Sequence, residues 1–123
     1  MAAEPGTIDI PAAVFRGMRS RGWINGDQVM PAAFRLRPTE TGLTFGRTHA
    51  AATSGITAFG SAELISEQIL ALPHGLSFGP HPDRPNDCLE LNGVPPYSTE
   101  EHAIDRAMTV ASDLAALVIR LIR

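Results

Sequence analysis

The clearest structural signal in the chain is Ser98-Thr99-Glu100-Glu101, followed by HAIDRAMTVASDLAALVIRLIR over residues 102–123. The first four residues match a capping box, in which the Ser98 hydroxyl accepts a hydrogen bond from the Glu101 amide and the Glu101 carboxylate reaches back. Acidic residues near the start and arginines near the end complement the helix dipole. Because apolar residues recur at helical spacing as far as Ile122, the pattern predicts one amphipathic helix of about six turns.

Upstream, two segments alternate apolar and polar residues on either side of a turn signal. They are residues 30–37 and 43–45, and Pro38-Thr39-Glu40-Thr41-Gly42 between them has the composition of a turn. The alternation predicts a β-hairpin that turns at residues 39–42. Its core face would carry Phe34, Leu36, Leu43 and Phe45.

The remaining predicted elements are shorter. Residues 56–59 are typical of a strand, and Ser61 is typical of the N-cap of a helix that runs to Leu72, where Pro73 stops it. Residues 76–78 and 88–91 are typical of two later strands. We expect residues 1–12 to form a loose N-terminal segment.

Together these elements predict an α+β fold. An antiparallel or mixed β-sheet would pack on one face against the short helix and the long C-terminal helix. The 123 residues suit a single domain spanning 1–123. The hydrophobic content of 44% argues against intrinsic disorder. The charged content of 19% is a little low for a domain that acts alone, which indicates that some surface contacts a partner.

The cysteine content and the distribution of apolar residues indicate the cellular compartment of the protein. Cys88 is the only cysteine, which excludes an intramolecular disulfide and favours a reducing cytoplasm. The first six residues lack the basic and apolar regions of a signal peptide. Residues 114–122 are apolar but interrupted by Arg120, and they are far shorter than the roughly 20 residues of a membrane span. We therefore expect a cytoplasmic protein with no membrane partner.

The net charge of −3 is unevenly distributed. Residues 1–50 hold six arginines and four acidic residues, whereas residues 51–123 hold four arginines and nine acidic residues. All the basic side chains are arginine, whose guanidinium fork binds phosphates and carboxylates and stacks on aromatic rings. Such arginine usage, together with abundant Ala, Gly and Pro, is also typical of a GC-rich bacterial genome.

Several strings along the chain resemble a group of small hypothetical bacterial proteins. They are Trp23-Ile24-Asn25-Gly26-Asp27, Pro31-Ala32-Ala33-Phe34, Gly42-Leu43-Thr44 and Pro85-Asn86-Asp87-Cys88-Leu89-Glu90-Leu91-Asn92-Gly93. That group shares a Trp, a Pro-x-Ala-Phe segment and a late strand of Asn-Pro-Ala-His type followed by Gly. Cys88 stands where the group has His. The resemblance spans most of the chain and implies one compact unit, but no activity.

Residues 74–88 concentrate side chains that bind metals or act as nucleophiles. Their spacing matches no standard ligand pattern, and three nearby prolines indicate an exposed, extended turn. A thiol nucleophile at Cys88 with a histidine as base is a further reading, although a lone cysteine in a strand is more often a small buried hydrophobe. We expect no cofactor. The candidate metal ligands are His74, His81, Asp83 and Cys88.

Arginines also cluster beside an aromatic residue, Trp23. Such a surface binds phosphates, or single-stranded nucleic acid through ion pairs and stacking. The excess of positive charge in residues 1–50 is small. This favours the alternative, in which these arginines form ion pairs with the acidic residues of the second half of the chain. The candidate anion-binding residues are Arg16, Arg19, Arg21, Arg35 and Arg37.

The leading functional interpretation is a small bacterial accessory subunit that binds a protein partner or a second copy of itself and has no chemistry of its own. The support is the end of the predicted C-terminal helix, which is apolar nearly all round. Two alternatives stay open: arginine-mediated binding of nucleic acid or phosphate, and a small enzyme or metal-binding protein centred on residues 74–88. The candidate interface residues are Leu117, Ile119 and Trp23.

Two candidates exist for the segment that packs against the apolar C-terminal end of this predicted helix. A second chain would bury Leu117 or Ile119, which fall outside the main apolar stripe of the helix. Alternatively, the N-terminal segment folds back over the helix within one chain, contributing Ile8, Ile10, Val14 and Phe15.

Overall fold

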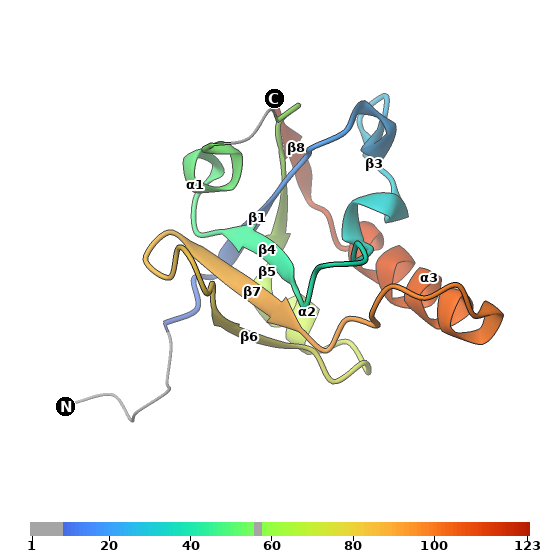
Figure 1. Ribbon diagram of the computed structural model, residues 1–123. Helices are drawn as coiled ribbons and strands as arrows, with labels where there is room; N and C mark the ends of the chain where they lie inside the picture. Colours follow the sequence, from blue (N-terminus) through green and yellow to red (C-terminus); the bar gives the residue numbers. More distant parts are fainter. Residues whose placement is uncertain (1–8, 56–57) are drawn as a thin grey trace.

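The computed structural model describes residues 9–55 and 58–123 and confirms the α+β fold class (Figure 1). Six strands form one antiparallel sheet in the order β6-β7-β4-β1-β5-β8. In that order their bounds are Ser77–Pro80, Cys88–Asn92, Leu43–Gly46, Ala13–Gly17, Ser61–Ile65 and Arg120–Ile122. The helices are α1 (His49–Thr53), α2 (Ser66–Leu70) and α3 (Glu101–Ala116), and two 3-10 turns are η1 (Arg21–Trp23) and η2 (Pro31–Phe34). The two strands predicted at residues 76–78 and 88–91 correspond to β6 and β7.

Strand β1 lies inside the sheet, where the sequence pattern gave no expected strand. It pairs with β5 through five residue pairs and with β4 through one. The chain entering β1 is fixed by Ser66, whose Oγ donates to the Pro11 carbonyl at 2.7 Å and whose amide donates to the Ala12 carbonyl at 2.9 Å. Residues 11 and 12 are therefore tied to the start of α2 rather than loose.

One face of the sheet encloses the core with α3 and η2. Phe34 on η2 stacks on Phe45 of β4 with ring centroids 6.4 Å apart, and Phe78 of β6 meets Phe45 edge-on at 5.7 Å. Alternate residues of the strands point to this face because the side-chain period of a strand is two. The buried members from β1, β4, β7 and α3 include Val14, Leu43, Leu89, Leu91, Val110, Ala111 and Leu114.

Helix α1 lies on the other side of the sheet from α3 (Figure 1). Thr48 caps it, since the Thr48 Oγ1 accepts a hydrogen bond from the Ala51 amide at 3.0 Å. Gly46 lets the helix approach β4, because a Cβ atom at this position would lie 2.4 Å from the Ala52 nitrogen. The helix is thus held directly against the sheet.

The hairpin predicted at residues 39–42 is wrong. Residues 31–34 form η2, because Pro31 presets the backbone for a first helical residue, and β4 pairs with β1 and β7 instead. The four residues assigned to the hairpin's core face are nevertheless buried: Phe34, Leu36, Leu43 and Phe45. Their apolar character predicted burial correctly without identifying the partner strands.

A different hairpin lies earlier in the chain. Strands β2 (Ile24–Asn25) and β3 (Gln28–Val29) are joined by two residues, and Gly26 there has a φ of 65°. The two loop residues are Gly26 and Asp27, and only Gly26 has a positive φ. Glycine at the first position of a two-residue loop is typical of a type II′ turn, which needs a positive φ there. The Gly-Asp pair is therefore the sequence signal for this hairpin.

The helix predicted from Ser61 to Leu72 is wrong in its first half. Residues 61–65 form β5, and the helix is confined to Ser66–Leu70. Strand β5 pairs with both β1 and β8, so pairing along both of its edges outweighs local helix propensity. The strand expected at residues 56–59 falls partly outside the described residues, and Ala58 and Phe59 are not in a strand.

The C-terminal helix ends at Ala116, short of the predicted end at Ile122. Residues 120–122 form the edge strand β8, in which Leu121 lies opposite Ala62 of β5. The capping box is also wrong in detail. The Ser98 Oγ accepts from the Glu100 amide at 3.0 Å, and no side chain caps α3. The apolar run after residue 116 therefore belongs to a turn and a strand, where burial follows a different period.

Candidate functional site

The Arg16 side chain on β1 is buried, which is unusual for a charged residue. Arg16 is only 3% exposed. Its Nε donates to the Ala33 carbonyl at 2.9 Å, and its Nη1 donates to the Thr44 carbonyl at 3.1 Å. The guanidinium therefore ties β1 to η2 and to β4.

Strand pairing explains why an arginine fits at this position. Strands β1 and β4 pair only at Phe15 and Gly46, whereas β4 and β7 pair through four residue pairs. Beyond that single pair, the Thr44 carbonyl of β4 accepts its hydrogen bond from the Arg16 side chain. A buried carbonyl needs a donor, and here the guanidinium supplies it.

Arg16 is charged but has no carboxylate partner among the described residues. The ion pairs found there involve Arg37, His74, Arg120 and Arg123. Burial lowers the pKa of Arg16 to about 10; Glu40 opposes this effect, and the nearby charges of Arg19 and Arg37 add to it. A buried cation beside other cations is a place where an anion is favoured.

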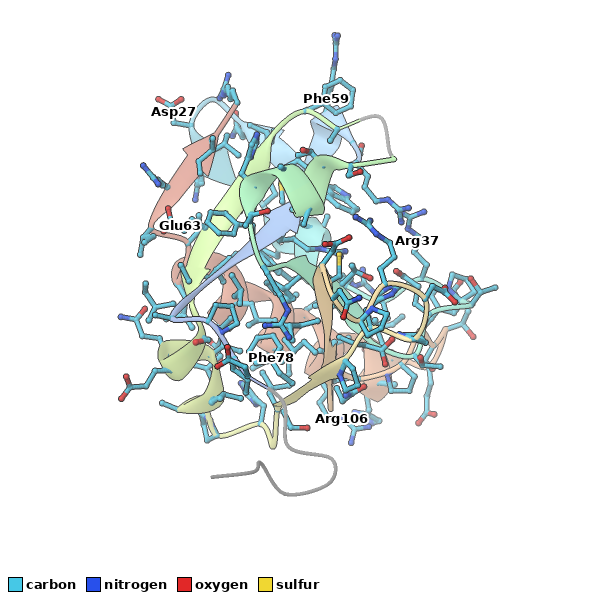
Figure 2. All side chains as sticks on the ribbon, turned by 90° about the vertical axis from the view of Figure 1, so that its left-hand side faces the viewer. Asp27, Arg37, Phe59, Glu63, Phe78 and Arg106 are labelled. Atoms are coloured by element: carbon cyan, nitrogen blue, oxygen red, sulfur yellow. The ribbon has the colours of Figure 1, made fainter. Side chains whose placement is uncertain are left out.

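A cavity of about 220 Å³ lies beside Arg16, and we call it the Arg16 cavity. Its walls come from β1, β4, α1 and the loop that joins β6 to β7. Figure 2 looks onto the side of the molecule that carries α1. The charged or titratable side chains that line the cavity are Arg16, Arg19, His81, Asp83 and Arg84. Three arginines against one aspartate give it an excess of positive charge.

The loop at the mouth of the cavity is anchored by its own hydrogen bonds. Arg84 donates from Nη2 to the Ala51 carbonyl at 3.1 Å and from Nη1 to the Ser54 carbonyl at 3.4 Å. These carbonyls lie at the end of α1, where no helical donor is available. The His81 Nδ1 accepts from the Asp83 and Arg84 amides, each at 3.1 Å. These hydrogen bonds therefore hold this part of the cavity wall in a fixed arrangement.

Trp23 lies beside Arg16 and forms part of the outer surface. The Cζ atoms of Arg16 and Arg37 lie 5.3 and 6.0 Å from the centre of the Trp23 ring, within cation–π range. Trp23, Arg35, Arg37 and Tyr97 are among the residues that line a shallow hollow of about 300 Å³. The structure thus places three of the predicted anion-binding arginines around the predicted interface tryptophan.

The remaining candidate, Arg21, lies elsewhere. Its Cζ is 5.2 Å from the Phe59 ring centre, and it shares a separate depression with Arg123. Arg123 in turn pairs with Asp27 at 3.3 Å. In Figure 2, the labelled Phe59 and Asp27 mark this upper end of the molecule, well apart from Arg37. The candidate arginines therefore form separate groups, and no continuous basic stripe joins them in the part of the chain that the structure describes.

The candidate metal ligands are not gathered into one group. The His74 Nε2 lies 2.7 Å from the Asp113 Oδ2 and so links the turn after α2 to α3. His81 and Asp83 line the Arg16 cavity instead. Within residues 9–55 and 58–123, no three His, Cys, Asp or Glu side chains are close enough together to hold a metal ion.

Cys88 is buried under α1, with its Sγ 3.9 Å from the Ala51 carbonyl. Burial raises the pKa of the Cys88 thiol, and the nearby Arg84 opposes this only in part. His49, one of the histidines considered as a base, has its Nδ1 2.7 Å from the Ser61 Oγ of β5, which is not adjacent to β7 in the sheet. The environment therefore favours a neutral thiol over a thiolate nucleophile.

The two candidate interface residues near the C-terminus differ. Leu117 is half-buried and packs against the core of its own chain, whereas Ile119 is 53% exposed. The alternative predicted from the sequence is an N-terminal segment that folds back over the C-terminal helix. Of its residues, Val14 and Phe15 belong to β1 and Ile10 packs against the core. Ile8 lies outside the described residues.

Parts of the cavity were not predicted from the sequence. Thr44, Ala51, Ala52 and Ser54 line it, but small side chains and backbone carbonyls carry no recognisable chemical signal. Residues 13–17 have the sequence Ala-Val-Phe-Arg-Gly, a short apolar run without period-two alternation, so the pattern gave no clear signal for a strand. Arginine is mostly found at exposed positions, so the burial of Arg16 was not expected.

None of the helices in the described part of the chain is long and apolar enough to cross a membrane. No protein-family model, curated protein or solved structure gives a significant match to the chain. A function is therefore inferred from the residues of the site alone.

Proposed function

We propose that the protein binds a small anionic ligand in the Arg16 cavity and carries out no covalent chemistry of its own. The observation that carries this proposal is the buried charge of Arg16, which has no carboxylate partner among the described residues. Arg19 adds a second guanidinium to the same cavity. An anion there would supply the missing countercharge and accept charge-assisted hydrogen bonds.

The arrangement of the arginines favours a local site over a long polyanion. Nucleic-acid binding depends on many phosphate contacts along a basic stripe. Here Arg21 lies apart from Arg37, the second half of the chain is acidic, and Arg37 is engaged by Glu40 at 3.9 Å. A single anionic group in one cavity needs no such stripe.

Removing Arg19 should weaken anion binding without disturbing the fold, because its side chain is exposed and it makes no side-chain hydrogen bond among the described residues. In calorimetric titrations at constant ionic strength, phosphate and sulfate should each bind the wild-type protein at one site. Arg19→Ser should weaken both by about twofold to fivefold, since solvent screens an exposed charge.

The matched control is Arg21→Ser, which removes the same charge at the distant Phe59 end. This variant should keep the wild-type affinity within about twofold. Two results count against the proposal. One is a wild-type protein that gives no saturable heat with either anion. The other is an equal loss in both variants, which would reveal only a dependence on net charge.

Self-association is a second candidate function, and Ile119 favours it. This side chain is 53% exposed and directly precedes β8, an edge strand paired with β5. An edge strand carries unpaired backbone groups that a second chain can pair with. A second copy of the chain would therefore cover apolar surface and extend the sheet.

The corresponding prediction concerns the oligomeric state. The wild-type protein should sediment as a dimer at micromolar concentration, and Ile119→Gln should sediment as a monomer because a buried amide would lack partners. Met108→Gln is the control, since Met108 is also exposed, at 37%, but lies on α3. A wild-type protein that stays monomeric across the concentration range would rule out the association.

A further inference from the structure

The His81 ring is fixed in one tautomer by the loop around it. Its Nδ1 accepts hydrogen bonds from the Asp83 and Arg84 amides, each at 3.1 Å. A ring nitrogen that accepts cannot carry a proton, so the proton of the neutral ring is on Nε2. No described residue accepts a hydrogen bond from this Nε2. His81 is one of the residues that line the Arg16 cavity, and this N–H is its free donor.

Donors from three places therefore line one small space. Arg16 comes from β1, Arg19 follows that strand, and His81 begins the loop after β6. A phosphate monoester presents three terminal oxygens, all strong acceptors, whereas a carboxylate presents two. The number of donors suits the phosphate.

Asp83 and the cavity size restrict what can carry that phosphate. The Asp83 carboxylate lines the same space and would repel a second phosphate group. The volume of about 220 Å³ is below the range of about 300 to 1,000 Å³ that is typical of sites for drug-sized ligands. A single phosphate on a small carrier fits both restrictions.

Resting on the proposed function, we infer that the ligand of the Arg16 cavity is a small phosphomonoester, and that His81 is a specificity-determining donor to its phosphate. Arg16 supplies the buried charge, Arg19 supplies a second charge at the exposed side, and the His81 Nε2–H supplies a directional hydrogen bond. Asp83 selects against diphosphates and longer polyanions.

The test is a calorimetric comparison of inorganic phosphate, glycerol 3-phosphate, pyrophosphate and a thymidine decamer. The first variant is His81→Asn, because the Asn Oδ1 occupies the place of the His Nδ1 and keeps an acceptor for the loop amides. It lacks the Nε2–H, so the affinity for phosphate and for glycerol 3-phosphate should fall about tenfold. Arg21→Ser is the control and should change neither affinity by more than about twofold.

A second variant, Asp83→Asn, tests the selection against polyanions. It removes the negative charge and leaves the Asp83 amide bonded to His81. Its affinity for pyrophosphate should rise severalfold, and its affinity for glycerol 3-phosphate should change little. Amide hydrogen exchange at Asp83 and Arg84 shows whether the loop keeps its structure in each variant.

The possible failures are distinguishable. If His81→Asn binds glycerol 3-phosphate as tightly as wild type does, the role of His81 is wrong. If pyrophosphate or the decamer binds wild type more tightly than glycerol 3-phosphate does, the ligand class is wrong while the anion site stands. If no anion binds wild type at all, the proposed function itself fails. Should His81→Asn lose protection of the loop amides, the Asp83→Asn result still decides the ligand class.

Discussion

Replacing Phe34 with alanine should lower the free energy of unfolding by about 3 to 5 kcal/mol, because the substitution removes a fully buried aromatic ring and leaves a cavity. Phe34 is 0% exposed and stacks on Phe45 of the sheet at 6.4 Å. The backbone cannot easily close the space, since the adjacent Ala33 carbonyl is held by Arg16. Urea unfolding followed by circular dichroism measures the loss.

The control for this prediction is Met108→Ala. Met108 is 37% exposed on α3, and alanine is a good helix former, so its effect should be within about 0.5 kcal/mol. If Phe34→Ala and Met108→Ala unfold at the same urea concentration, Phe34 does not hold η2 against the sheet.

The elements that were predicted correctly from the sequence are those in which apolar residues repeat with one unambiguous period. Residues 88–91 alternate and residues 101–116 repeat at helical spacing, so β7 and the start of α3 were predicted near their observed positions. Residues 61–65 and 117–122 contain short apolar runs that suit either a helix or a strand. Their state depends on pairing between β1, β5 and β8, which local sequence does not specify.

The candidate site was predicted in pieces. Arg16, Arg19 and Trp23 were singled out because arginines beside an aromatic residue indicate anion binding, whereas His81 and Asp83 were singled out as metal ligands. The structure places Arg16, Arg19, His81 and Asp83 around one cavity. Their proximity depends on the β1–β4 pairing and on the anchored loop, and the carbonyl groups that hold Arg16 belong to residues with no distinctive side chain.

Replacing Arg16 with methionine should weaken phosphate binding by about 100-fold, the scale expected when a buried charged partner is removed. Methionine has similar length and apolar character, so it fills the space of the arginine stem. It supplies no charge and no donor to the cavity. Exposed rim residues such as Arg19 should matter much less, because water screens them.

Methionine also leaves the Ala33 and Thr44 carbonyls without their donor, while it relieves the cost of a buried charge. The absolute stability of this variant is therefore not the readout. A ligand that binds only the folded state raises stability by RT ln(1 + [L]/Kd), so the dependence of Tm on phosphate reports binding separately from the starting stability.

The decisive measurement is the Tm of wild type, Arg16→Met and Arg21→Met as phosphate is increased at constant ionic strength. For wild type and for Arg21→Met, Tm should rise with the logarithm of the phosphate concentration and along parallel lines. For Arg16→Met, Tm should stay constant until the phosphate concentration is about 100-fold higher than the one at which the wild-type Tm begins to rise. A wild-type Tm that does not respond to phosphate, or an Arg16→Met Tm that rises as steeply as wild type, would show that the Arg16 cavity is not an anion site.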